Sequence, residues 1–317
     1  MKIKSIIPLV LTLSLVSCSQ GTLFEDKVFA FDTMIDIKLF EGEKDSLNEV
    51  RNIANLYSKL TDNYQSADIN NVYTLNNTNE EVTIDSGLYD LLKISYEINT
   101  KGATYFNPLC GSLAKKWKEA LDKKEVLSIG VIESELDKIN SSSLVFKDNN
   151  IVQRVGDAEI DLGAIAKGYY LDKVKDYFVS KEYTKYLVNA GSSSILLGKK
   201  DSSDGLFNVG LTHIKNGYLK LSNCFVSTSS NSEQGVEIGG VRYSHIINPK
   251  TGSAINENDA VIVVSDTGYF GDAISTSLTM SSVEEIKQTE KDYGIKAIVI
   301  KNSEVIYKNN ELEVYYH

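Results

Sequence analysis

The sequence contains few of the residues on which several common architectures depend. Among its 317 residues there are only 3 cysteines, 3 prolines and 3 histidines. So few and so scattered cysteines exclude a disulfide scaffold and a cysteine-rich zinc site, and the scarcity of histidine excludes a His-cluster metal centre. The scarcity of proline excludes collagen-like and proline-rich chains. A formal net charge of -10 argues against a broad nucleic-acid surface, where Lys and Arg must neutralise phosphates.

The chain does contain enough apolar material to fold. Hydrophobic residues make up 42% of it, which suffices for a core and excludes disorder of the whole chain. Its length allows two domains of ordinary size or one large one. No stretch rich in proline, glycine or serine interrupts it after residue 26. We therefore predict one domain over residues 27–317.

The amino terminus is typical of an export signal. Two lysines precede an apolar run from Ile6 to Val16, which is too short for a helix that needs about 20 residues to span a bilayer. Leu15–Cys18 resembles a bacterial lipobox. We predict a lipoprotein signal peptide at 1–17, a lipid such as palmitate on Cys18, a tether over 18–26, and a membrane-anchored domain on the periplasmic or extracellular side. The alternative is a simple cleaved signal with a chance cysteine.

The two remaining cysteines, Cys110 and Cys224, would stand in an oxidising compartment after export. They are a possible pair. We expect two separate buried thiols, because nothing in their spacing brings them together.

The periodicity of apolar residues predicts an α+β fold. Apolar residues in 47–60 recur at the spacing of one helix face, whereas short alternating runs dominate the second half of the chain. Neighbouring strands are often one tight turn apart, which favours largely antiparallel sheets with packed helices over a doubly wound sheet. Helices are predicted at 47–60, 89–98, 110–121, 132–139, 164–179, 270–280 and 283–293. Strands are predicted as a pair or bent strand at 27–40, as a hairpin at 144–155, and at 186–189, 194–197, 207–210, 218–221, 224–227, 236–238, 241–247, 260–265, 297–300 and 304–307.

Residues 160–174, IDLGAIAKGYYLDKV, are typical of a phosphate-binding turn. A strand ends at Asp161, two glycines bracket small residues, and Lys167 lies near the start of a helix. Small residues let the backbone approach a ligand, and free N–H groups with a lysine at a helix start favour phosphate. The segment resembles the DLGGIAKG signature of the ApbE family of FAD:protein FMN transferases. Without that resemblance, an ordinary turn with a surface lysine would be an equal alternative.

Residues 242–252, RYSHIINPKTG, place His245 between a hydrophobic strand and a turn. They are similar to the family's SHIIDPRTG block, with Asn248 for Asp and Lys250 for Arg. A histidine at such a junction is expected to be packed on one side and exposed on the other. A lone histidine is more often structural, and the match to the block favours a functional one.

Residues 271–280, GDAISTSLTM, resemble the family's DALSTAL helix. Asp272 and Thr276 are four residues apart, so both oxygens project from the same face of a helical turn. Such oxygen ligands suit Mg²⁺, which takes one or two carboxylates and completes its shell with phosphates and water. The alternative is that Asp272 only stabilises a helix start through the dipole.

Weaker matches support these three. Residues 103–117, ATYFNPLCGSLAKKW, resemble the family's AFDPTVGPLVNLW, with Asn107 and Cys110 at the positions of an Asp and a Val. Residues 31–37, FDTMIDI, correspond to FxxMGT, with Ile35 for the glycine. Tyr64 is the candidate for the family's early active-site tyrosine. The matches run in order from residue 31 to residue 280.

The resemblance implies a single T-fold-type catalytic domain. Such an enzyme would use Mg²⁺ to transfer FMN from FAD to a Thr or Ser hydroxyl of an acceptor protein, a subunit of a membrane electron-transfer complex, and would release AMP. The absence of a GxGxxG fingerprint agrees with FAD as a substrate. The catalytic residues would be His245 as general base, Lys167 against the pyrophosphate, and Asp272. The metal would be held by Asp272, Thr276, the Ala164 carbonyl and a group near Ser275. FAD would contact Met34, Tyr64, Tyr105, Phe106, Asn107, Asp161, Lys167, His245 and Ile246.

Two other functions remain open at this point. In a Mg²⁺-dependent FAD pyrophosphatase, water would replace the acceptor hydroxyl and the products would be FMN and AMP. A non-catalytic flavin-binding or solute-binding lipoprotein would retain FAD without releasing AMP. The latter leaves unexplained why Asp272 and Thr276 accompany a phosphate-type turn.

Overall fold

The computed structural model describes residues 22–101, 105–231, 235–255 and 257–317. The predicted signal peptide and Cys18 lie outside the described residues. Within the described ranges, no helix combines the length and the apolar character that a membrane crossing requires.

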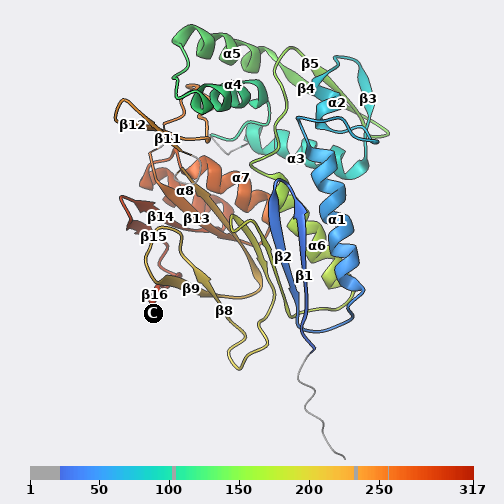
Figure 1. Ribbon diagram of the computed structural model, residues 1–317, viewed down its shortest axis with the longest axis vertical. Helices are drawn as coiled ribbons and strands as arrows, with labels where there is room; N and C mark the ends of the chain where they lie inside the picture. The colour runs from blue at the N-terminus through green and yellow to red at the C-terminus, as the bar shows by residue number, and fades with distance from the viewer. Residues whose placement is uncertain (1–21, 102–104, 232–234, 256) are drawn as a thin grey trace, which may run out of the picture.

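An eight-stranded antiparallel sheet forms the centre of the fold (Figure 1). Its strand order is β1-β2-β6-β7-β10-β13-β14-β15, so segments from both ends of the chain meet in one sheet. The strands are β1 (Phe24–Ala30), β2 (Thr33–Leu39), β6 (Tyr186–Ala190), β7 (Ser194–Leu197), β10 (Cys224–Ser230), β13 (Ala260–Ser265), β14 (Lys296–Lys301) and β15 (Glu304–Lys308).

Both faces of this sheet are covered, which explains why all six residues of β13 are buried. Val261 and Val263 belong to the core on the helical face, whereas Ile262 and Val264 pack with the residues of a small second sheet. This alternation is what a strand buried on two sides requires. The helical face carries α1 (Ser46–Thr61), α6 (Ala166–Ser180), α7 (Gly268–Leu278) and α8 (Val283–Tyr293). The second sheet has the order β16-β9-β8, from β16 (Tyr315–Tyr316), β9 (Gly217–Leu221) and β8 (Phe207–Gly210).

The remaining elements gather at one end of the central sheet, at the top of Figure 1. They comprise four helices, a three-stranded sheet of order β3-β5-β4 and a hairpin. Their bounds are α2 (Val72–Asn76), β3 (Glu81–Thr83), α3 (Ser86–Lys101), α4 (Gly111–Asp122), α5 (Ile129–Ser141), β4 (Ser143–Lys147), β5 (Ile151–Val155), β11 (Val236–Ile238) and β12 (Val241–Tyr243).

Helices α6 and α7 approach each other at two glycines. A Cβ atom added to Gly168 would lie 2.1 Å from the Gly268 carbonyl oxygen, and one added to Gly268 would lie 2.3 Å from the Gly168 oxygen. Only glycine fits on both sides, because the atoms in the way belong to the backbone and cannot rotate aside.

Gly168→Ala should therefore force α6 and α7 apart. We expect a loss of about 3 kcal/mol in the free energy of unfolding, at the upper end of overpacking costs. Denaturant unfolding measures it, and Gly130→Ala, where an added Cβ meets no atom within 4 Å, is the matched control. Equal stability of the two variants would show that α6 and α7 are not so tightly packed.

The α+β class and the antiparallel sheets are confirmed, with three local corrections. The predicted strand 241–247 is wrong beyond Tyr243, because Ser244 N–H bonds to the Ala254 carbonyl at 2.7 Å and turns the chain into a loop. The predicted helix at 164–179 begins at Ala166 instead. Short elements α2, β3 and β16 were missed, because two to five residues carry too little periodicity. Cys110 and Cys224 are both free thiols, as predicted; Cys224 is buried as expected, whereas Cys110 is only half-buried.

Candidate active site

A two-lobed cleft contains most of the residues singled out from the sequence. The first lobe has a volume of about 900 Å³ and the second of about 450 Å³. Asp161, Lys167 and His245 line both lobes, so the three meet where the lobes join. Tyr64 lines the first lobe. The second lobe is lined by Tyr105, Phe106, Asn107, Ala164, Ile246 and Thr276, among others.

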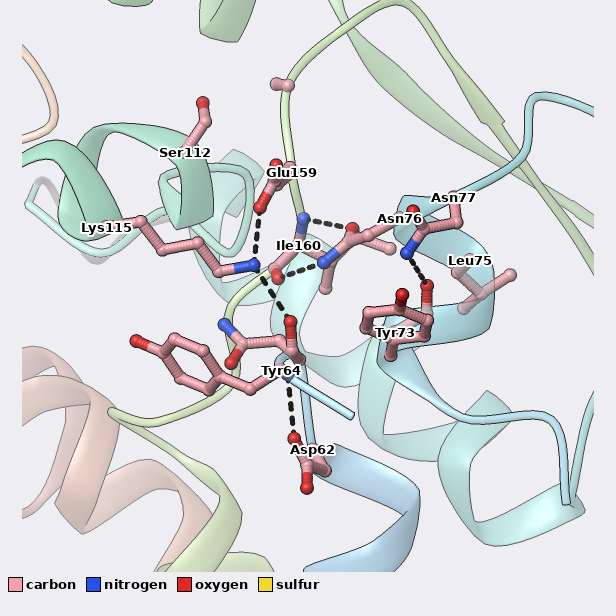
Figure 2. Close-up of polar contacts among 12 residues, drawn as sticks. Asp62, Tyr64, Tyr73, Leu75, Asn76, Asn77, Ser112, Lys115, Glu159 and Ile160 are labelled. Carbon is pink, nitrogen blue, oxygen red and sulfur yellow. Dashed lines mark hydrogen bonds and ion pairs between the residues drawn. The ribbon is translucent and has the colours of Figure 1, made fainter. Parts of the chain in front are cut away.

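The segment that carries Asp161 is held by side chains from α2 and α4 (Figure 2). The Asn76 amide accepts from Ile160 N–H at 2.7 Å and donates to the Ile160 carbonyl at 2.9 Å. The Lys115 ammonium bonds to Glu159 and to the Asn63 carbonyl, each at 2.8 Å. It also lies 5.0 Å from the centre of the Tyr64 ring, so one lysine ties the tyrosine to the segment.

Removing the Asn76 amide should loosen this segment. Asn76→Ala leaves two backbone groups of Ile160 without their partner, which we expect to lower the free energy of unfolding by about 2 kcal/mol. Thermal or denaturant unfolding measures the loss. Asn77→Ala removes only a bond to the Tyr73 carbonyl within the exposed end of α2 and serves as control. A loss at Asn76 no larger than at Asn77 would contradict the anchoring role.

At the start of α6, the N–H of Gly168 has its partner outside the helix. Gly168 N–H donates to Asp272 Oδ2 at 2.7 Å instead of to the carbonyl four residues before it. The carbonyl of Ala164 therefore accepts no hydrogen bond from the described part of the chain. Ala164 lines the second lobe, so a carbonyl oxygen is available beside Asp272.

Asp272 is a buried carboxylate, with 7% of its surface exposed. Besides Gly168 N–H, it accepts from Ser227 Oγ at 2.6 Å and from Ser194 Oγ at 2.8 Å. Burial raises the pKa of Asp272, and the charge of Lys167 and these hydrogen bonds oppose the rise. Among the described residues it has no ion-pair partner within 4 Å. A buried carboxylate of this kind is stabilised by a cation.

Hydroxyl groups from β10 surround the same turn of α7. Ser229 Oγ lies 3.0 Å from Thr276 Oγ1 and 2.9 Å from Ser275 Oγ. Thr276 lines the second lobe, whereas Ser275 is 1% exposed and lines neither lobe. The serines at 194, 227 and 229 were not predicted as site residues. The only signal in the sequence was that Ser227 and Ser229 alternate in the strand 224–230 and therefore lie on the same face of the sheet.

His245 lies on the loop that follows β12. Trp117 of α4 holds this loop by donating from Nε1 to the Gly252 carbonyl at 2.8 Å. The imidazole is exposed to the cleft, yet its surroundings lower its pKa, first through burial and second through the charge of Lys167. Because its ordinary pKa is about 6.5, His245 is neutral at pH 7 and can accept a proton.

The aromatic residues provide flat surfaces along the cleft. Tyr105 receives the Lys250 ammonium 4.9 Å from its ring centre, and Asn107 Oδ1 accepts from Leu109 N–H at 2.9 Å. Phe106 and Ile246 are 4% and 6% exposed, so only an edge of each faces the second lobe. Met34 is the exception: it is 47% exposed and lines neither lobe.

The donor set at Asp272 fits a divalent cation. Asp272, Thr276 and the Ala164 carbonyl are all oxygen donors, which is the chemistry that Mg²⁺ prefers. An ionised carboxylate has about four acceptor positions. Asp272 receives three hydrogen-bond donors, which leaves one position for a metal. No group of three or more His, Cys, Asp or Glu side chains suited to a metal occurs in the described ranges, so a site here depends on hydroxyl and carbonyl oxygens.

The fold and the cleft together place the protein in a class of α+β proteins. In this class an antiparallel sheet carries helices on one face, and a large polar cleft contains a lysine at the start of a helix. The ApbE family model matches residues 31–299, and the chain belongs to this family.

Named relatives and solved structures agree with this assignment. The chain is 30% identical over 240 residues to an FAD:protein FMN transferase of Klebsiella pneumoniae, covering 71% of this chain and 72% of the relative. An FAD:protein FMN transferase of Treponema pallidum is 27% identical over 241 residues, covering 69% of this chain and 67% of the relative. The ApbE protein of Thermotoga maritima superimposes with a TM-score of 0.76 at 22% identity, covering 92% of this chain and 98% of that one. The flavin transferase ApbE of Vibrio cholerae superimposes with a TM-score of 0.73 at 19% identity, covering 93% of this chain and 97% of that one.

Proposed function

We propose that this protein is a Mg²⁺-dependent FAD:protein FMN transferase that moves FMN from FAD to a Thr or Ser hydroxyl of an acceptor protein and releases AMP. The observation that carries the proposal is the contact of Asp272 with the phosphate-type turn, 2.7 Å from its carboxylate to Gly168 N–H. Family membership and the names of the relatives supply the substrate and the reaction.

Two residues at the junction of the two lobes, Lys167 and His245, suit the roles that phosphoryl transfer requires. Lys167 would lie against the pyrophosphate and neutralise part of its charge. His245 would take the proton of the acceptor hydroxyl as the new oxygen–phosphorus bond forms. The bond between the FMN phosphorus and the bridging oxygen breaks, and AMP leaves with that oxygen. Lys167 is the second residue of helix α6, which would hold its side chain in place.

Asp272, Thr276 and the Ala164 carbonyl would hold the Mg²⁺. When bound, the ion stabilises the charge on the phosphate oxygens in the transition state. The chain's own contribution is a carboxylate of fixed orientation, since three hydrogen bonds hold Asp272 before any ligand arrives. FAD would lie along both lobes, with the aromatic rings of Tyr64 and Tyr105 as flat walls.

The decisive experiment measures both products. The protein is incubated with FAD and Mg²⁺, with and without a candidate acceptor, and AMP is quantified while the acceptor is weighed by mass spectrometry. We expect one FMN on the acceptor for each AMP released. Rapid release of FMN and AMP without an acceptor would favour the pyrophosphatase instead. Retention of FAD without AMP would favour a binding protein.

We further propose that the protein is anchored to the membrane through a lipid on Cys18 and works outside the cytoplasm. The lipobox-like sequence Leu15–Cys18 supports this. An acceptor in a membrane electron-transfer complex would then lie at the same surface. Labelling cells with a palmitate analogue should tag the wild-type protein and not Cys18→Ser. Equal labelling of both would overturn the lipid assignment.

A further inference from the structure

Helices α6 and α7 begin with the same short pattern. Residues 168–172 read GYYLD and residues 268–272 read GYFGD, each with a glycine four residues before an aspartate. The two patterns bind each other reciprocally. Asp272 Oδ2 accepts from Gly168 N–H at 2.7 Å, and Asp172 Oδ1 accepts from Gly268 N–H at 2.8 Å. The two helices also touch at these glycines, as described above.

The two aspartates differ in what else they contact. Asp272 binds two serines beside the cleft, whereas Asp172 binds only α7: its Oδ2 accepts from Tyr269 N–H at 2.8 Å. The first N–H groups of a helix have no partner within the helix, and a negative charge there is favoured by the dipole. Asp172 lines neither lobe. Its contacts therefore fix only where α7 begins relative to α6.

That relative placement matters because the proposed metal ligands come from two elements. The Ala164 carbonyl precedes α6, whereas Asp272 and Thr276 belong to α7. A slide of α7 along α6 would change the distance between these oxygens, and Mg²⁺ tolerates little departure from octahedral geometry.

We propose that Asp172 is a positioning residue for the metal site, which holds the first turn of α7 on α6 and thereby sets the spacing between the Ala164 carbonyl and the oxygens of Asp272 and Thr276. The inference rests on the proposed function, since it concerns the metal of that reaction. It assigns a task to a carboxylate outside the cleft that touches neither substrate nor metal.

The test is Asp172→Asn. An asparagine side chain has one acceptor oxygen, so it can serve only one of the two N–H groups and turns an NH₂ toward the other. Burial raises the pKa of Asp172 to about 6, with Asp176 adding to the rise and the two amides and Lys175 opposing it, so assays at pH 8 compare the ionised carboxylate with the amide. We expect the Mg²⁺ concentration for half-maximal AMP release to rise at least about 10-fold, as for other residues that orient metal ligands. The KM for FAD at saturating Mg²⁺ should change less than about 3-fold.

A second readout needs no turnover. Hydrogen exchange of the metal-free protein should be faster at residues 268–272 and at Gly168 in the variant. Asp176→Asn, which removes an exposed carboxylate one turn further along α6, is the charge-matched control and should leave both measurements unchanged. If Asp172→Asn does not fold, Asp172→Ser keeps one short acceptor and is measured instead.

The outcomes separate the inference from the function. An active wild-type enzyme with the same Mg²⁺ dependence in wild type and variant would overturn the positioning role and leave the proposed function intact. Equal losses in Mg²⁺ and FAD affinity would make Asp172 a general structural residue and also overturn it. A wild-type protein that consumes no FAD would overturn the proposed function and this inference with it.

Discussion

Asp272→Asn is expected to lower Mg²⁺-dependent release of AMP from FAD by at least about 1000-fold. A bound metal supplies several kcal/mol of transition-state stabilisation, and about 4 kcal/mol corresponds to that factor. The amide has nearly the shape of the carboxylate but lacks the charge that attracts the ion. One of its two positions also becomes an NH₂ group that faces donors such as Gly168 N–H.

The measurement is AMP release against Mg²⁺ concentration, together with calorimetric binding of Mg²⁺ or Mn²⁺. Asp266→Asn, an exposed aspartate between β13 and α7, is the matched control and should behave as wild type. Circular dichroism shows whether the variant is folded. Wild-type turnover in a folded Asp272→Asn protein would remove the metal assignment.

His245→Ala should reduce FMN transfer by about 100-fold to 10,000-fold, the usual contribution of a general base. FAD binding should weaken far less, because the imidazole is one of many groups that line the two lobes. Single-turnover transfer and equilibrium binding of FAD, followed by flavin fluorescence, separate the two effects. His317→Ala, at the exposed end of the chain, controls for the loss of an imidazole. Equal losses in binding and transfer would make His245 a binding residue.

The pH dependence of transfer gives an independent check on His245. Burial, and then the charge of Lys167, lower the pKa of this imidazole below its ordinary value of about 6.5. A base must be unprotonated to act, so the rate should be level above pH 6.5 and fall as the pH drops through the lowered pKa. This acidic fall should be absent in the residual activity of His245→Ala. A fall centred above pH 6.5 would point to another titrating group.

Much of the site followed from local patterns in the sequence. The turn at 160–167 predicted a ligand-facing backbone, and Asp161 and Lys167 do line both lobes of the cleft. The spacing of Asp272 and Thr276 predicted one helix face, and both do lie on the side of α7 that meets β10. These predictions depended on backbone geometry within one turn, which nearby residues determine.

Predictions that depended on contacts between residues distant in the sequence were less complete. Met34 was expected at the flavin; its side chain is exposed on β2 and lines neither lobe, and its contact with the flavin stays a prediction. The loop that carries His245 was expected as part of a strand over 241–247. Its course is instead determined by Ser244 bonding to Ala254 and by Trp117 bonding to Gly252. Such partners lie too far along the chain for periodicity to reveal them.

By itself, the sequence determined the α+β class, the family and the chemical types present at the site: a lysine at a helix start, a histidine in a turn, a carboxylate and a hydroxyl on one helical face. Only the tertiary structure decided how Asp272 contacts the turn at 160–167 and the start of α6. Gly168 gives its N–H to an aspartate 104 residues later, which frees the Ala164 carbonyl, and serines of β7 and β10 complete the surroundings of that aspartate. The reason is that periodicity reports only on neighbours within a few residues, whereas a buried carboxylate is stabilised by whichever donors the packing of distant elements brings to it.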